Sequence, residues 1–158
     1  MTIRLTRFFG ALAVTLLLAA TATHAADYSS GTITVSSPWA RATAQLAKVA
    51  GGFVSITNHG STPDKLIAID SDIAGMAMVH KMTMENGVAK MEMVDDLAIP
   101  AGGTVELKPA SFHIMFMQLK NPLKEGDRFT AVLTFERAGK ITVEFVVGGA
   151  GAQSAPTP

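Results

Sequence analysis

Methionine and histidine side chains are concentrated in one stretch of this 158-residue chain. Eight of its nine methionines lie between Met76 and Met117, and so do two of its four histidines, His80 and His113. A thioether is a soft, neutral ligand that prefers Cu(I), and imidazole binds copper in general. The chain has no cysteine, which excludes thiolate copper sites and iron–sulfur clusters. These residue types therefore predict a copper(I) site made of methionine and histidine.

The spacing places three of these donors on one face of a predicted strand over 112–119. Residues two positions apart on a strand project from the same side. His113 therefore shares a face with Met115 and Met117. The other face carries three residues typical of a core: Phe112, Ile114 and Phe116. This segregation indicates that the methionines have a role other than that of the aromatic side chains.

A second set of donors flanks a predicted hairpin turn at Asn86-Gly87. Before the turn, His80, Met82 and Met84 share one face of their strand; after it, Met91 and Met93 share one face of theirs. Asn-Gly tolerates the positive φ angles of a tight hairpin turn. Pairing about this turn is expected to bring Met91 near His80. Two strands that each present such donors on one face can converge on a single ion.

The N-terminus has the three parts of a secretory signal peptide. Arg4 and Arg7 supply positive charge, an apolar run over 8–20 follows, and Thr23-His24-Ala25 has small residues at the positions that a signal peptidase reads. The run is shorter than a membrane-spanning helix. We expect cleavage after Ala25, or alternatively after Ala26, and a periplasmic location without a membrane span in the mature form. An uncleaved membrane anchor is the less favoured alternative.

Charge and length limit the kinds of partner and the number of domains that this chain can have. Without Arg4 and Arg7 the chain carries 11 basic and 13 acidic residues. Nothing in this balance suggests a nucleic-acid partner, which requires a basic face. A mature chain of about 133 residues suits one domain. We expect residues 26–147 to form that domain, a monomer, and residues 148–158, which lack large apolar and charged side chains, to form a flexible tail.

Short β-type runs separated by turn signals fill the mature sequence. The predicted strands are Gly31–Val35, Gly52–Thr57, Lys65–Asp70, Val88–Val94, Thr104–Leu107, Phe112–Leu119, Phe129–Phe135 and Ile141–Val147. The stretch 71–84 is either a short helix or a strand, and we favour a strand from about Met78. Many short strands at this spacing predict an all-β antiparallel sandwich or barrel. Trp39 is expected to anchor the core, and Arg41 to bond backbone carbonyls or a carboxylate.

Four donors at fixed spacing resemble a known family. His80 is followed after ten residues by Met91, after a further 21 by His113, and after one more by Met115. This pattern resembles the periplasmic copper chaperones of the PCuAC family. The resemblance covers about 33–147, and it includes the blocks Trp39-Ala40-Arg41-Ala42-Thr43, Ile56-Thr57-Asn58, Lys108-Pro109 and Pro122-Leu123-Lys124-Glu125-Gly126-Asp127.

The resemblance implies a fold, a ligand set and a role. The fold would be a Greek-key β-sandwich of the cupredoxin-like or immunoglobulin-like kind. One Cu(I) would be held by His80, Met91, His113 and Met115 and passed on by ligand exchange. The acceptor would be the copper subunit of cytochrome c oxidase, whose binuclear centre is being assembled, or a Sco-type protein.

Two departures from the family pattern bear on these expectations. Ala110-Ser111-Phe112 stands where the family usually has Gly-Gly-Tyr, so this turn is expected to have a less permissive backbone. Some relatives carry a His- and Met-rich tail, whereas residues 148–158 contain neither residue. We therefore expect no tail site.

Two alternatives to a copper chaperone stay open. The first is a non-metal interaction module with a methionine-rich core or binding patch, because methionine packs adaptably. Convergence of the four donors on one surface would argue against it. The second is an enzyme, for which Ser111 shares the parity of His113. The chain has no Gly-x-Ser-x-Gly elbow, so we predict no catalytic residue and no enzymatic activity.

Overall fold

The computed structural model describes residues 26–156, which contain eleven strands and no helix. The predicted signal peptide over residues 1–25 lies outside the described residues. The strands are β1 Asp27–Ser30, β2 Ile33–Arg41, β3 Val49–Asn58, β4 Asp64–Ser71, β5 Met76–Glu85, β6 Val88–Val94, β7 Leu97–Ile99, β8 Thr104–Leu107, β9 Phe112–Met117, β10 Arg128–Phe135 and β11 Gly139–Gly148. Among the residues described, no helix has the length and apolar character needed to cross a membrane.

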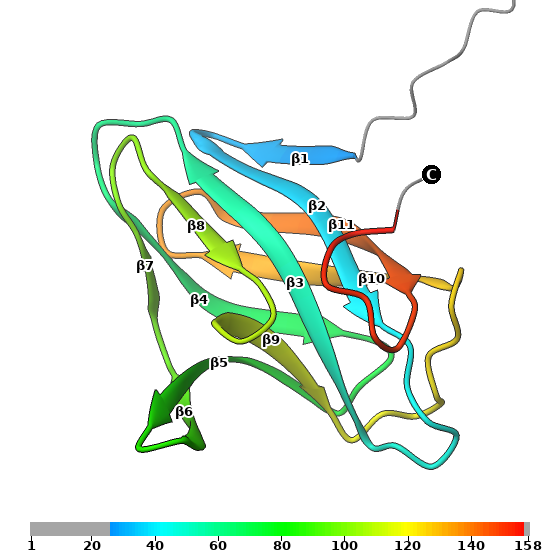
Figure 1. The fold of residues 1–158 in the computed structure, drawn as a ribbon. Helices are drawn as coiled ribbons and strands as arrows, with labels where there is room; N and C mark the ends of the chain where they lie inside the picture. Colours follow the sequence, from blue (N-terminus) through cyan, green and yellow to red (C-terminus); the bar gives the residue numbers. More distant parts are fainter. Residues whose placement is uncertain (1–25, 157–158) are drawn as a thin grey trace, which may run out of the picture.

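Backbone hydrogen bonds join the strands into a ladder that closes on itself. Its order is β1-β2-β11-β10-β4-β5-β9-β3-β8, and β2 also pairs with β3. Figure 1 shows β2, β11, β10 and β4 behind β3, β8 and β9, so that two layers enclose one core. The predicted all-β sandwich is confirmed. One pairing is parallel rather than antiparallel, between β11 and β2, because strands so far apart in sequence need no hairpin between them.

The core is built by alternation along the strands. In β10 and β11, every second side chain is buried. Phe116 from β9, Phe129 from β10 and Phe145 from β11 pack together in the centre, with ring centroids 5.1 to 5.6 Å apart. Phe129 and Phe145 are stacked, and Phe116 meets both edge-on. The apolar periodicity of these strands therefore gives the face that each one buries.

All eight predicted strands are present, and the ambiguous stretch 71–84 forms the strand β5 from Met76 onward. β1 and β7 were not predicted. β1 consists of polar and half-exposed residues at the edge of the ladder, and β7 has only three residues. Such short segments carry too little periodicity to reveal a strand.

A bulge in β2 changes which side of the sheet Trp39 occupies. The register with β3 shifts between Ser36 and Trp39, and Ser37 adopts a φ of 51°. Trp39 is buried as expected, but it packs on Phe53, with ring centroids 4.4 Å apart, outside the main core cluster. Arg41 covers the Phe53 ring, 5.5 Å from its centroid. A bulge inverts the alternation that follows it, so the sequence pattern alone misplaces this tryptophan.

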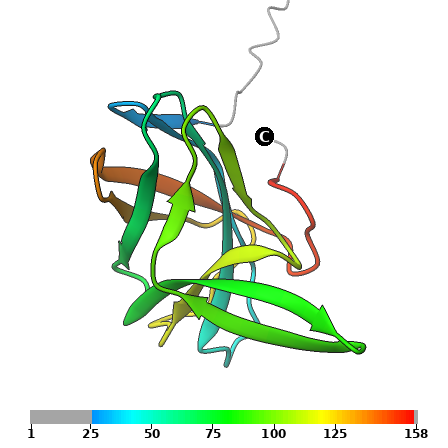
Figure 2. The same cartoon turned by 90° about the vertical axis from the view of Figure 1, so that its left-hand side faces the viewer.

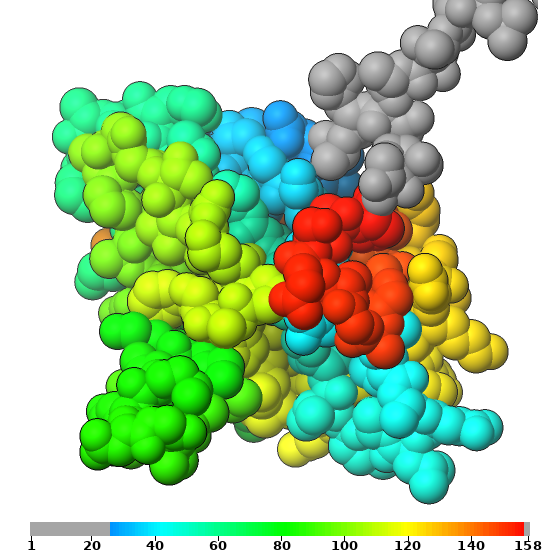
Figure 3. Space-filling model, in the orientation of Figure 1, coloured from blue at the N-terminus to red at the C-terminus, as the bar shows by residue number. Residues whose placement is uncertain are grey.

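Arg41 also connects the body of the protein to the segment after β11. Its Nε donates a 2.8 Å hydrogen bond to the carbonyl of Ala152, which confirms the predicted backbone contact. Figure 3 shows this segment (red) lying against the sandwich. The flexibility of residues 148–158 remains a prediction, because a hydrogen bond in one conformation does not measure motion.

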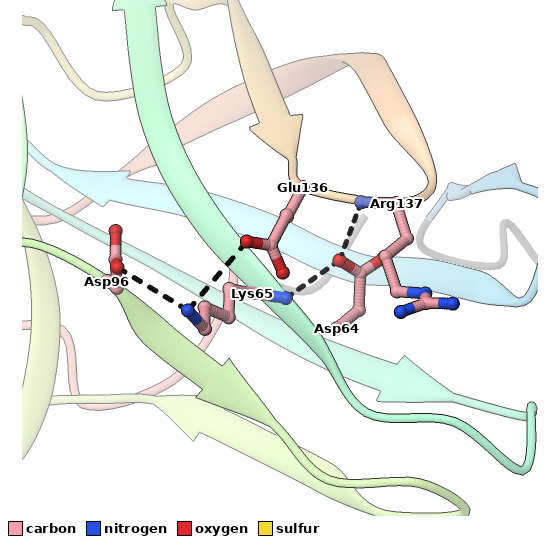
Figure 4. Close-up of polar contacts among 5 residues, drawn as sticks. All are labelled: Asp64, Lys65, Asp96, Glu136 and Arg137. Carbon is pink, nitrogen blue, oxygen red and sulfur yellow. Dashed lines mark hydrogen bonds and ion pairs between the residues drawn. The ribbon is translucent and has the colours of Figure 1, made fainter.

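A buried carboxylate fastens the far end of the sandwich from within. Asp64 is only 3% exposed and accepts hydrogen bonds from the backbone N–H groups of Lys65, Arg137 and Ala138, at 2.7 to 2.9 Å. Its charge is thus fully solvated by the protein, as a buried carboxylate requires. On the surface nearby, the Lys65 ammonium lies 3.7 Å from Asp96 and 3.8 Å from Glu136 (Figure 4). This corner joins the start of β4 to the β10–β11 turn.

Candidate metal centre

Three neighbouring strands carry all the predicted donors. β5 pairs with β6 through the Asn86-Gly87 turn, whose φ angles of 51° and 79° are those of a tight hairpin turn. On its other edge β5 pairs with β9. The β5–β6 hairpin projects from the body as an arm (Figure 2). The arm and β9 therefore form one continuous three-stranded surface.

The register places every methionine of the described residues on one face of this surface. Directly opposite residues of antiparallel strands project from the same side. The opposite pairs are Met76–Met117, Met78–Met115 and His80–His113 between β5 and β9, and His80–Met93, Met82–Met91 and Met84–Ala89 between β5 and β6. We call these eight methionines with His80 and His113 the methionine face.

The methionine face is the outer side of the sheet. The residues that alternate with it, such as Val79, Ile114 and Phe116, belong to the buried core. Within residues 26–156, no methionine is part of that core. Met84, Met91 and Met93 are more than half exposed. A methionine-rich core is therefore excluded as an explanation of this composition.

His80 and His113 form the centre of the face. Their ring centroids lie 6.0 Å apart in an edge-on arrangement. His113 is buried, and its Nδ1 lies 3.1 Å from the carbonyl oxygen of Ser111. A carbonyl only accepts hydrogen bonds, so Nδ1 carries a proton, which in the neutral imidazole puts the lone pair on Nε2. This arrangement is typical of a metal-binding histidine oriented by an outer partner.

His80 has a polar atom that the protein leaves unpaired. Its Nδ1 is buried and has no hydrogen-bond partner among the described residues. Burial lowers the pKa of His80 below its ordinary value, and the neighbouring His113 lowers that pKa further. The neutral imidazole is thus favoured, which is the form that binds a metal.

The turn before β9 holds this pair in place. The Ser111 carbonyl accepts hydrogen bonds from His113 Nδ1 and from the backbone N–H of Met82, each at 3.1 Å. It thereby links the turn before β9 to β5. Ala110 adopts a φ of 61°, and Lys108 N–H donates a 2.7 Å bond to the Phe112 carbonyl. This left-handed φ, which glycine adopts without steric cost, agrees with the less permissive backbone expected for this turn. Sequence reasoning missed the Ser111 carbonyl, because a main-chain acceptor leaves no signal in residue type.

The two methionines of the predicted ligand set lie on either side of the histidines. Met93, not Met91, is directly opposite His80; Met91 lies diagonally, level with Met82. Met115 is level with Met78, in the other direction along β5. The structure thus brings the two histidines together and puts Met91 and Met115 on the same face without setting them side by side.

No other donor type completes the site. Residues 26–156 contain no group of three His, Cys, Asp or Glu side chains that could hold a metal ion. His59 is exposed in the turn after β3, where its backbone N–H donates a hydrogen bond to the Thr32 carbonyl. The side-chain donors that share the methionine face with the histidine pair are thioethers, which favour soft cations.

The fold and this face define a class: an all-β sandwich that presents paired imidazoles among thioethers on its outer surface. The LpqE-like family model matches residues 33–147. The chain therefore belongs to the LpqE-like family.

Individual relatives agree with that membership. Protein Lxx21020 of Leifsonia xyli subsp. xyli is 32% identical over 104 residues, which are 65% of this chain; the chain thus spans 61% of that relative's length. The apo PCuAC domain of PmoF2 has the same fold, with a TM-score of 0.71 and 24% identity over 82% of this chain and all of that domain. The solution structure of CuI-DR1885 from Deinococcus radiodurans has a TM-score of 0.60 and 28% identity over 82% of this chain and 85% of that one.

Proposed function

We propose that this protein is a copper(I) chaperone that binds its cargo on the methionine face. The observation that carries the proposal is the pairing of His80 with His113, one oriented by a carbonyl and the other unpaired, amid thioethers that face solvent. A structural histidine pair would have its nitrogens satisfied within the protein. The similarity to CuI-DR1885, at 28% identity, supports copper as the ion.

The proposed ligands are His80, Met91, His113 and Met115. The histidines offer neutral nitrogens within reach of each other, and the two methionines approach from either side along β5. Met91 sits on the exposed arm, so it is the ligand best placed to bind first and to leave first. Thioethers release the ion without taking up a proton, whereas histidine release depends on pH.

An open surface suits transfer rather than catalysis. The donors lie on the outside of the sheet, where an acceptor can approach and share the ion during ligand exchange. The chain is proposed to act after export to the periplasm, as a monomer and not as an enzyme. Its acceptor would be the copper subunit of cytochrome c oxidase or a Sco-type protein, as the resemblance to the PCuAC family implies.

A competition titration tests the proposal. Cu(I) is titrated into the protein lacking residues 1–25, against a chromophoric chelator strong enough to suppress weak sites. We expect one equivalent to be retained. The His113→Ala/Met115→Ala double variant should lose it, and His59→Ala, which removes an exposed histidine outside the face, should not. Equal retention by the double variant would instead favour the interaction module with a methionine binding patch.

A further inference from the structure

Four thioethers form a compact block beside the histidine pair. Met76 lies directly opposite Met117, and Met78 directly opposite Met115, so that β5 and β9 contribute two each. Directly opposite residues have Cβ atoms about 4.5 to 5.5 Å apart. Methionine side chains are long and flexible enough to bring their sulfurs together over that spacing. We call these four residues the thioether block.

Backbone contacts hold the two strands together at the open end of this block. The N–H of Gly75 donates to the carbonyls of Met117, at 3.0 Å, and Gln118, at 3.3 Å. A side chain at Gly75 would collide with Gln118, since an added Cβ would lie 2.4 Å from its Oε1. The approach of β5 to β9 is therefore maintained up to Met76 and Met117.

Packing does not account for the block. Met76 is 45% exposed, and Met78, Met115 and Met117 are partly exposed on the outer side of the sheet. The core side of the same strands is filled by Ala77, Ile114 and Phe116. On the β3 edge, Gly51 stands opposite Met115 and presents no side chain over it. Four adjacent, accessible thioethers on a face that strands usually give to polar residues point to a ligand.

We propose that the thioether block is a second soft-cation site, which takes Cu(I), and Ag(I) in its place, through sulfur alone. The inference rests on the proposed function for the identity of the natural ion. Met115 lies between the two sites and can serve either one, so an ion can pass between the histidine pair and the block by exchange of one ligand at a time; when Met115 binds at the histidine pair, Met76, Met78 and Met117 remain to hold a second ion. The cation keeps its charge throughout, and no proton moves when a thioether binds or leaves. The block thus extends the path along which the ion enters or leaves the protein.

Silver(I) is a suitable probe, because it is soft and does not change valence under these conditions. Ag(I) is titrated into protein with 13C-labelled methionine methyl groups, and bound equivalents are counted by native mass spectrometry. We expect two equivalents in the wild type, with the Met76 and Met117 methyl signals moving during the second. Met76→Leu/Met117→Leu should bind one. Met84→Leu, a matched change on the same face outside both sites, should bind two.

A further variant separates this inference from the proposed function. His80→Ala/His113→Ala removes the histidine pair, and it should still bind one Ag(I) with the Met76 and Met117 signals shifted. One equivalent in the wild type with those signals unmoved would overturn the second site while leaving the histidine site standing. Two equivalents in Met76→Leu/Met117→Leu would also overturn it. Leucine matches methionine in volume, and a thermal melt of each variant checks the fold.

Discussion

Asp64 and His80 are both polar groups drawn into the protein, and their surroundings differ in one respect. The Asp64 carboxylate accepts hydrogen bonds from three backbone N–H groups, so both of its oxygens have partners within the protein. The His80 Nδ1 is buried without a partner among the described residues, beside His113, whose Nδ1 is oriented by the Ser111 carbonyl. A polar group that the protein satisfies holds the fold together, whereas one that it leaves open is available for binding.

The largest effect on stability is expected from removing the Asp64 carboxylate, whose oxygens accept hydrogen bonds from three backbone N–H groups. Asp64→Ala leaves three backbone N–H groups without their acceptor, and we expect a loss of about 4 kcal/mol in unfolding free energy. Urea denaturation measures it. Asp96→Ala is the control, because this exposed carboxylate lies 3.7 Å from Lys65 and its loss should cost less than about 0.5 kcal/mol. Equal midpoints for the two variants would show that Asp64 does not fasten the corner.

Removing His80, whose Nδ1 the protein leaves unpaired, should weaken Cu(I) binding rather than stability. Outer partners of metal ligands are worth 10- to 100-fold in affinity, so His80→Ala is expected to weaken Cu(I) binding by more than about 100-fold. The unfolding free energy of the metal-free protein should not fall, because the substitution removes an unpaired buried nitrogen. Competition titration and urea denaturation on the same samples give both numbers. A large stability loss with unchanged affinity would reverse the comparison.

The strained turn beside the site offers a smaller and opposite change. Ala110 has a φ of 61°, which glycine adopts without steric cost. Ala110→Gly is expected to raise the unfolding free energy by about 0.5 to 1 kcal/mol, after allowing for the greater freedom of glycine in the unfolded chain. Ala98→Gly, on the exposed side of β7, should lower it. If both changes destabilise equally, the turn is not strained.

The smallest effect is expected from pH on the metal-free protein. Folding lowers the pKa of His80 from its ordinary value of 6.5. Just below pH 6.5 the unfolded chain therefore binds more protons than the folded one, so stability falls as the pH drops through that value. Urea midpoints at pH 7.5 and 5.5 measure this slope. The slope should be shallower in His80→Ala than in the unsubstituted protein; identical slopes in the two would contradict the assignment.

Much of the fold could be predicted because the strands alternate cleanly. Phe112, Ile114 and Phe116 face the core as their period indicates, and Asn86-Gly87 turns as expected. Prediction was wrong where that alternation is interrupted or too short. The bulge before Trp39 moves its side chain out of the main core, and the three residues of β7 carry no usable pattern.

The donor set was predicted only in part, for a related reason. Residue type and strand parity predict that His113 and Met115 share one face of a strand, and that His80 shares a face with Met82 and Met84. The hairpin register also follows from a two-residue turn, but it sets Met93 rather than Met91 opposite His80. The ligand assignment to His80, Met91, His113 and Met115 stays a prediction until copper binding is measured.

Residue types and spacing alone account for the soft donors in place of cysteine, for their confinement to one parity, and for the turn that folds the arm. Those properties are local, since they follow from side-chain type and from the two-residue period of a strand. The pairing of β9 with β5 could be seen only in the folded chain: it brings His113 to His80 and places Met115 and Met117 beside Met78 and Met76. That register joins segments far apart in the chain, and it is set by how the opposite face packs into the shared core.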